Sequence, residues 1–478
     1  MSSFPPQPAP QSPRWPQAPT VLRRRCSSGL EVWMVPQPEL PLFTAQLIVQ
    51  GPNEGPGRPT RGRDERGSAA DPFGHEGLAA FTAQLLLEGC GSRDALAFAD
   101  ALDLLGASLG SAATQDGSTI HLQCLSRFAA QGLELMASAV LEARFEEAEI
   151  ERIRAQWLGA LAQRDDDPRR ITRSIGARVF FGAEHPYAHP EDGYAESIQS
   201  IDQALLQRAH RQLWHPQGAV LLLTGEFAPE PIFSLVEALF STWDAGVAAQ
   251  PLAKRAVSRP SFQRSQVVVH PRRALSQTQV RFMLPAHPRN GVMESEYALL
   301  NAIFGGAFTS RLMQNLREDK GLSYGASSAV VRWAHAGYWL ASASVDAQES
   351  ELALREFLYE IQRLKSEPPS AEELERAKTT YLSDWSQSFE SHNGMLAQLA
   401  GMARYGFAPE HLAATAGQIA ETSLEQVQAL AESLATAPYC LSLVGEPASL
   451  LEALEALQLP EPLFCDAWGT KLVGEAQR

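Results

Sequence analysis

The stretch GLAAFTAQLLLEG, residues 77–89, decides the fold that we expect for this chain. It predicts a helix that begins near Gly77 and ends at Gly89. Glycine is common just beyond the last turn of a helix, because it adopts the left-handed conformation that closes the turn without a steric penalty. The remaining elements are most easily placed outward from this helix.

Strands and further helices are expected on both sides of it. Residues 31–35 (EVWMV) and 42–50 (LFTAQLIVQ) alternate like strands on either side of a turn, and residues 118–125 (STIHLQCL) alternate in the same way. Residues 51–75 are rich in Gly, Pro and charge and predict a long loop. Helical patterns cover residues 98–109, 128–141 and 146–164.

The second half of the chain repeats this order. Strands are predicted at residues 279–284 and 338–344, and helices at residues 294–304, 349–365 and 371–388. Landmarks keep a nearly constant offset between the halves. Gly225 and Gly445 each close an apolar strand (445 − 225 = 220), and Gly117 and Gly337 each precede one (337 − 117 = 220).

We therefore predict an α+β fold of two homologous tandem units, each a mostly antiparallel sheet packed with helices. The units are expected at residues 21–245 and 266–470, with a linker at 246–265. Residues 1–20 predict a disordered, Pro-rich tail. Two such units in tandem can close around a cavity.

Composition narrows the class of protein. The formal charge of −15 over 478 residues argues against nucleic acid as a partner, since duplex binding needs a concentrated positive surface. The N-terminus has no apolar run typical of a signal peptide, and no stretch reaches the roughly 18 apolar residues of a membrane span. The five cysteines are scattered and form no CxxC pair. These features predict a cytoplasmic protein with reduced thiols.

The helix at residues 77–89 resembles the active-site helix of the insulinase (pitrilysin-type) zinc-peptidase family, in which the corresponding residues read G-L-A-H-F-L-E-H. In that family two His side chains one turn apart bind zinc, and the Glu beside them takes a proton from the zinc-bound water. A distant Glu on a later helix completes the metal shell. The resemblance covers almost all of residues 21–470.

At each of these chemical positions the chain departs from the family pattern. Ala80 and Gln84 stand at the two His positions, and Ala83 stands at the Glu position. The distant Glu is expected at Ala160 (160 − 84 = 76). Alanine has no donor atom, and a neutral amide is a poor zinc ligand. We therefore predict no catalytic residue, no metal ligand and no cofactor in this chain.

The segment GGAFTSRLMQNLREDKGLSYGASS, residues 305–328, resembles the part of the family that carries an arginine–tyrosine pair. Arg317 and Tyr324 occupy those two positions. In active relatives the pair reaches the substrate backbone and the developing oxyanion, to which both groups can donate hydrogen bonds. The alternative is an Arg317 that only pairs with an acid such as Glu318 or Asp319, beside a half-buried Tyr324.

The chain lacks the family's zinc ligands but keeps its arginine–tyrosine pair. By resemblance, this combination implies the non-catalytic, substrate-binding subunit of a heterodimeric zinc metallopeptidase that acts on peptides. The resemblance places zinc in a homologous partner, which would face this chain across a closed peptide chamber. One alternative is a scaffold or peptide-binding subunit with no role in proteolysis. Another is a peptidase with unusual metal ligands, although the scattered histidines supply no replacement set with zinc spacing. A homodimer is the alternative to the heterodimer.

Overall fold

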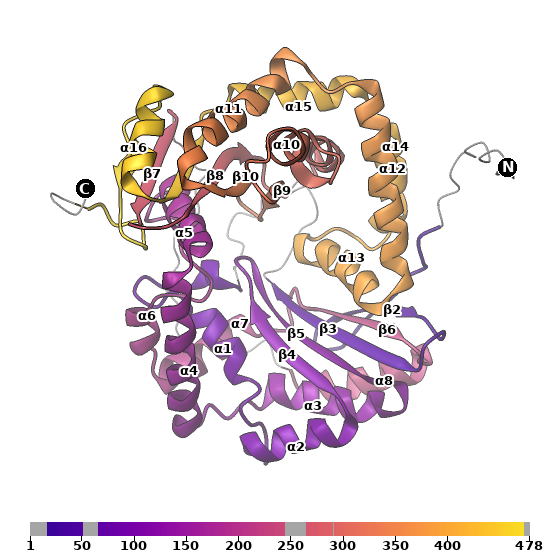
Figure 1. Ribbon diagram of the computed structural model, residues 1–478. Coiled ribbons are helices and arrows are strands. Elements are labelled where there is room, and N and C mark those ends of the chain that lie inside the picture. Colours follow the sequence, from indigo (N-terminus) through magenta and orange to yellow (C-terminus); the bar gives the residue numbers. More distant parts are fainter. Residues whose placement is uncertain (1–16, 51–65, 244–263, 290, 473–478) are drawn as a thin grey trace, which may run out of the picture.

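The computed structural model describes residues 17–50, 66–243, 264–289 and 291–472, and it contains two six-stranded sheets with helices (Figure 1). The predicted α+β class is confirmed. Most of the predicted tail at 1–20 and of the predicted linker at 246–265 lies outside the described residues.

The first sheet has the strand order β1-β2-β6-β3-β5-β4. Its strands are β1 (Leu22–Arg25), β2 (Glu31–Pro36), β3 (Leu42–Gln50), β4 (Ser108–Ala113), β5 (Gly117–Leu125) and β6 (Val220–Gly225). β2 and β6 pair in parallel, whereas the other neighbours are antiparallel. The sheet is therefore mostly antiparallel, as predicted.

The second sheet has the order β12-β7-β11-β8-β10-β9. Its strands are β7 (Gln266–Pro271), β8 (Gln277–Ala286), β9 (Ala326–Arg332), β10 (Gly337–Asp346), β11 (Cys440–Gly445) and β12 (Leu463–Phe464). Strands β7, β11, β8, β10 and β9 take the places that β2, β6, β3, β5 and β4 take in the first sheet. This shared order confirms the repeat that the offset of Gly225 and Gly445 predicts.

Sixteen α-helices connect and cover the strands of the described residues. In the first half they are α1 (Leu78–Leu85), α2 (Ala95–Leu105), α3 (Ala129–Leu141), α4 (Glu147–Asp166), α5 (Pro168–Phe181), α6 (Ala195–Gln199), α7 (Gln203–Leu213) and α8 (Pro229–Phe240). In the second half they are α9 (Glu294–Asn301), α10 (Arg311–Met313), α11 (Ser350–Ser366), α12 (Ala371–Gln387), α13 (His392–Tyr405), α14 (His411–Glu421), α15 (Leu424–Thr436) and α16 (Pro447–Ala456).

Two helices end earlier in the structure than the sequence predicts. The helix expected at 98–109 ends at Leu105, because Gly106 closes it in the left-handed conformation (φ 57°) and the chain enters β4. The helix that decides the fold begins after Gly77 as predicted, but its regular part ends at Leu85 and turns lead on to Gly89.

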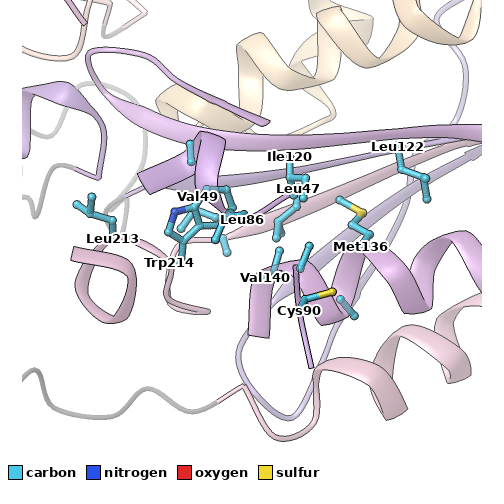
Figure 2. Packing of buried hydrophobic residues seen from close by; sticks show 14 of the residues in the cluster. Leu47, Val49, Leu86, Cys90, Ile120, Leu122, Met136, Val140, Leu213 and Trp214 are labelled. Atoms are coloured by element: carbon cyan, nitrogen blue, oxygen red, sulfur yellow. The ribbon is translucent and has the colours of Figure 1, made fainter. Parts of the chain in front are cut away.

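One face of the first sheet packs on its own helices. Leu47 of β3 and Ile120 of β5 are fully buried against Met136 and Val140 of α3 (Figure 2). Because successive strand residues point to opposite faces, alternate residues of β3 and β5 supply this core. Ile48 of β3 faces the other way and belongs to a different cluster.

The opposite face of each sheet is covered by a helix from the other half. Helix α13 of the second half packs on β3 and β6, and helix α5 of the first half packs on β8 and β11 (Figure 1). The two helices begin 224 residues apart (392 − 168 = 224). Each half therefore completes the core of the other, and the exchange holds the two sheets in one body.

Candidate functional site

Arg317 and Tyr324, which the sequence predicts as a pair, lie next to each other in space. The Arg317 guanidinium carbon is 5.3 Å from the centroid of the Tyr324 ring and 5.3 Å from that of Phe308. Both rings project outward, since Tyr324 is 92% exposed and Phe308 is 64% exposed. The three side chains form an open stack of aromatic, cation and aromatic. Phe308 lies within the quoted segment, but sequence reasoning did not single it out.

Arg317 also forms the ion pair that the alternative interpretation expects. Its Nε lies 3.3 Å from Glu318 Oε1, and the two side chains are 34% and 43% exposed. An exposed pair of this kind contributes little free energy, about 0–1 kcal/mol. The same alternative expects Tyr324 to be a half-buried residue, and this is wrong because the Tyr324 side chain is exposed. A weak ion pair leaves the Arg317 guanidinium accessible to a ligand.

The segment that carries the stack is held from beneath by a buried polar network. Asn315 Nδ2 donates hydrogen bonds to Glu356 Oε2 at 3.0 Å and to Glu360 Oε1 at 2.7 Å. Lys320 Nζ donates to Asn315 Oδ1 at 2.8 Å and lies 3.0 Å from Glu356 Oε2. Because networks of satisfied buried groups rigidify a region, these contacts to α11 fix the backbone that presents Arg317.

Of the four positions that carry the zinc ligands and the catalytic Glu in the resembled family, only two line a common cavity in this chain. Ala80 and Gln84 of α1 line one side of a cavity of about 450 Å³. Ala83 is buried and is not part of the cavity wall. Ala160 is exposed and also lies outside the wall.

The residues that α4 contributes to this wall are Trp157 and Arg164, about one turn on either side of Ala160. Trp157 Nε1 donates to Asp192 O at 3.0 Å. Arg164 is buried, donates to Gly193 O at 2.9 Å and pairs with Asp165 Oδ1 at 3.1 Å. An aromatic ring and a guanidinium thus occupy the region where the family pattern would place the last metal ligand.

The charges around this cavity do not suit a cation. Three arginines line it, Arg164, Arg170 and Arg173, against the carboxylates of Glu191 and Asp192. Burial raises the pKa of Glu191, although nearby Arg173 opposes that shift. Zinc needs about four nitrogen, sulfur or carboxylate ligands, and the residues present do not fit it. In the described part of the chain, no three His, Cys, Asp or Glu side chains gather where a metal could be held.

A further cavity, of about 360 Å³, adjoins the Arg317 stack. Tyr324 lines it together with Arg169 of α5 and Arg281 of β8. Helix α5 therefore borders both cavities, with Arg173 in the wall of the one at the zinc position and Arg169 in the wall of the one beside the stack. Sequence reasoning missed this arrangement.

Within the described ranges, no helix is long and apolar enough to cross a membrane. All five cysteines are buried and free. Burial raises the pKa of each of these thiols, for Cys440 to about 12. A thiol with a raised pKa is a poor nucleophile, so the cysteines serve as core residues.

Comparison with known proteins gives matches over much of the chain. Residues 65–179 match the family model described as insulinase (peptidase family M16), and residues 200–381 match the model described as peptidase M16 inactive domain. An uncharacterized zinc protease of Mycobacterium leprae is 25% identical over 392 residues, which is 81% of this chain and 85% of that protein. An uncharacterized zinc protease of Mycobacterium bovis is 26% identical over 275 residues, 58% of this chain and 61% of that relative's length.

Solved structures show the same fold. A peptidase M16 inactive domain from Pseudomonas fluorescens superposes with a TM-score of 0.78 at 24% identity, over 89% of this chain and 98% of that one. A protease from Helicobacter pylori gives a TM-score of 0.78 at 16% identity, over 89% of this chain and 100% of that one. The repeated sheets, the family models and these likenesses agree: the chain belongs to the insulinase family, peptidase M16, and is similar to its inactive type of domain.

Proposed function

We propose that this chain is the non-catalytic, substrate-binding subunit of a two-chain zinc metallopeptidase that acts on peptides. The observation that carries the proposal is a contrast within one molecule. Arg317 and Tyr324 form an exposed stack on a rigid support, whereas Ala80 and Gln84 offer no metal ligand set. A subunit that binds the substrate for a partner's zinc needs such an exposed stack but needs no metal ligands of its own.

In this proposal the zinc belongs to a homologous partner chain that faces this one across a peptide chamber. The guanidinium of Arg317 and the phenol of Tyr324 can each donate hydrogen bonds to a peptide carbonyl oxygen, and these bonds strengthen as negative charge develops on that oxygen. The Phe308 and Tyr324 rings limit the directions that the guanidinium can take. The free, buried cysteines support a cytoplasmic location for the pair, because thiols stay reduced there.

Turnover by the reconstituted pair tests the proposal. Arg317→Ala should lower kcat by about 100-fold to 1,000-fold, the usual effect of losing one oxyanion donor, while the two chains still assemble. Tyr324→Phe, which removes only the hydroxyl, should lower kcat with little change in peptide affinity. Arg355→Ala is the matched control, because Arg355 is an exposed arginine on α11 that pairs with Glu351.

The partner itself is found by gentle purification from native cells and mass spectrometry of what is recovered in equal amount. A homologue with the H-x-x-E-H sequence is expected. Recovery of this chain within an unrelated assembly, together with unchanged turnover for Arg317→Ala, would favour the scaffold role instead.

A further inference from the structure

The cavity beside the Arg317 stack is lined by groups that suit an anion. Arg169 and Arg281 are its only charged residues among the described ones that form the wall. The others are mainly hydroxyl and amide side chains: Thr172, Gln277, Gln279, Ser323, Tyr324, Ser327, Ser342 and Ser344. No described carboxylate lies in the wall. A guanidinium with hydroxyl and amide donors around it is the usual surrounding of a bound carboxylate or phosphate.

Arg281 is the key residue of this wall. It lies in the middle of β8, opposite Ser342 of β10 and Ser442 of β11. Its side chain points to the face of the sheet that α5 covers, which it shares with Gln279 and Met283 because alternate strand residues share a face. The side chain is therefore half-buried between the sheet and α5, where it lines the cavity.

Arg281 has no counterion in the described part of the chain. It forms no ion pair there with a carboxylate, and its hydrogen-bond partner is the hydroxyl of Tyr338. Burial lowers the pKa of Arg281, and the nearby Arg173 lowers it further. A guanidinium that is largely desolvated and has no carboxylate beside it costs free energy, and charged groups of this kind often lie at functional sites.

The arginines gather here against the trend of the whole molecule. The chain carries a formal charge of −15, yet Arg169 and Arg173 lie on the N-terminal turns of α5, and Arg281 lies on the strand beneath. Arg173 makes no ion pair with a described residue, although Glu191 is close enough to affect it electrostatically. Arginines therefore line both the cavity at the zinc position and the cavity beside the stack.

We propose that the cavity lined by Arg281 and Arg169 binds the carboxylate of an acidic side chain in the peptide substrate. This inference rests on the proposed function, because the peptide backbone is taken to lie against Arg317 and Tyr324. Tyr324 belongs to both the stack and the cavity wall, so one extended peptide can reach both. A cavity of about 360 Å³ is large enough for the side chain of a glutamate.

Paired peptides test the assignment. The probes are fluorescein-labelled decapeptides of Ala and Leu, each with one Glu at a scanned position, and their counterparts with Gln there. At low ionic strength the wild-type chain should bind the Glu peptide about tenfold more tightly than its Gln counterpart at one position, the effect of a charge-assisted hydrogen bond. Arg281→Gln and Arg169→Gln should reduce that preference, whereas Arg355→Gln on α11 should leave it unchanged.

The failure of this inference is distinguishable from the failure of the proposed function. If Glu and Gln peptides bind equally, and binding still requires Arg317, the carboxylate site is wrong, but the proposed binding of the peptide backbone by Arg317 and Tyr324 is supported. A second readout does not need a peptide at all. Glutarate should slow the modification of Arg281 by phenylglyoxal, measured by mass spectrometry, and the neutral analogue glutaramide should not. Equal modification rates with both compounds would overturn the site.

Discussion

Helices α5 and α13 take equivalent places in the two halves, yet only α5 carries a cluster of charges. Both cover the sheet of the other half, and both bury the same positions: Ile175 of α5 and Leu399 of α13 are fully buried, 224 residues apart (399 − 175 = 224). The exposed positions differ. Arg169 and Arg173 of α5 correspond to Asn393 and to an alanine of α13.

The strands beneath the two helices differ in the same way. Arg281 of β8 pairs with Ser442 of β11, and the equivalent pair of the first sheet is Gln46 of β3 with Leu222 of β6. The first sheet therefore has a neutral amide where the second has a guanidinium. Since the fold forms in both halves, it needs the shared apolar contacts and not the arginines. We therefore attribute the arginines of the second sheet and of α5 to ligand binding and not to folding.

The largest effects should come from the shared apolar contacts. Ile175→Ala and Leu399→Ala each remove a fully buried side chain, so each should lower the free energy of unfolding by about 2–5 kcal/mol. Urea unfolding followed by circular dichroism measures both. Leu451→Ala on α16, where the side chain is 40% exposed, is the control and should cost far less. A small loss for Ile175→Ala beside a large one for Leu399→Ala would show that the helix exchange is not reciprocal.

The next effect is a pH dependence of stability that arises in the first half and not in the second. His210 on α7 packs against Phe145 and hydrogen-bonds to Val140 O at 2.8 Å, whereas α15, the corresponding helix of the second half, contains no histidine. Burial lowers the pKa of His210 from 6.5 to about 4. Below pH 6.5 the unfolded chain therefore binds a proton that the folded chain does not. Stability contributed by the neutral side chain should be lost as pH falls from 6.5 to 4, by roughly 3 kcal/mol in all.

Urea unfolding of the wild type and of His210→Leu at a series of pH values checks this. The difference between the two curves should grow as the pH falls through that window and level off below pH 4, because both states of the wild type are then protonated. A difference that stays constant with pH would show that His210 titrates normally in the folded chain.

Periodicity and family resemblance predicted the parts of the fold that depend on local pattern. The strands and the nearness of Arg317 to Tyr324 follow from such patterns, because each lies within one segment of the chain. The repeat follows from landmarks that recur at a constant offset. The exchange of α5 and α13 could not be predicted in this way. The apolar side of a helix indicates that the helix is buried, but not which of two similar sheets buries it.

The candidate site shows the same division. Ala80 and Gln84 line their cavity as the helix spacing implies, but Ala160 does not, because a residue count can find the right turn of a long helix without fixing which side of that turn faces the cavity. The second cavity joins Arg169 and Arg281, which lie more than one hundred residues apart on a helix and a strand of different halves. Such a site depends on tertiary packing, and no local spacing records it.

A smaller effect should come from how closely each exchanged helix approaches its sheet. A Cβ at Gly176 of α5 would lie 2.9 Å from Ser442 Oγ and 3.0 Å from Met283 Sδ. Ser442 is held in place because its hydroxyl donates to Thr172 O at 2.8 Å. Overpacking of this kind costs about 1–3 kcal/mol, against about 1 kcal/mol that alanine gains in a helix.

Gly176→Ala should therefore destabilise the chain by about 1 kcal/mol in urea unfolding. The reverse change at the equivalent position of α13, Ala400→Gly, should also destabilise it, by about 0.5–1 kcal/mol, because that helix loses propensity and gains no closer packing. A stability gain for Gly176→Ala would mean that α5 does not need its close approach to β8 and β11.

The smallest effect concerns the arginine that marks the difference between the halves. Arg281→Met removes a half-buried charge but also removes the hydrogen bond to the Tyr338 hydroxyl, and the two contributions oppose each other. We expect the free energy of unfolding to change by less than about 1 kcal/mol, with a coupling of about 0.5–1 kcal/mol in the cycle with Tyr338→Phe. Gln46→Met is the control in the first sheet. A loss above about 2 kcal/mol for Arg281→Met would identify Arg281 as a structural residue, because a group kept for its ligand contributes to binding and little to folding.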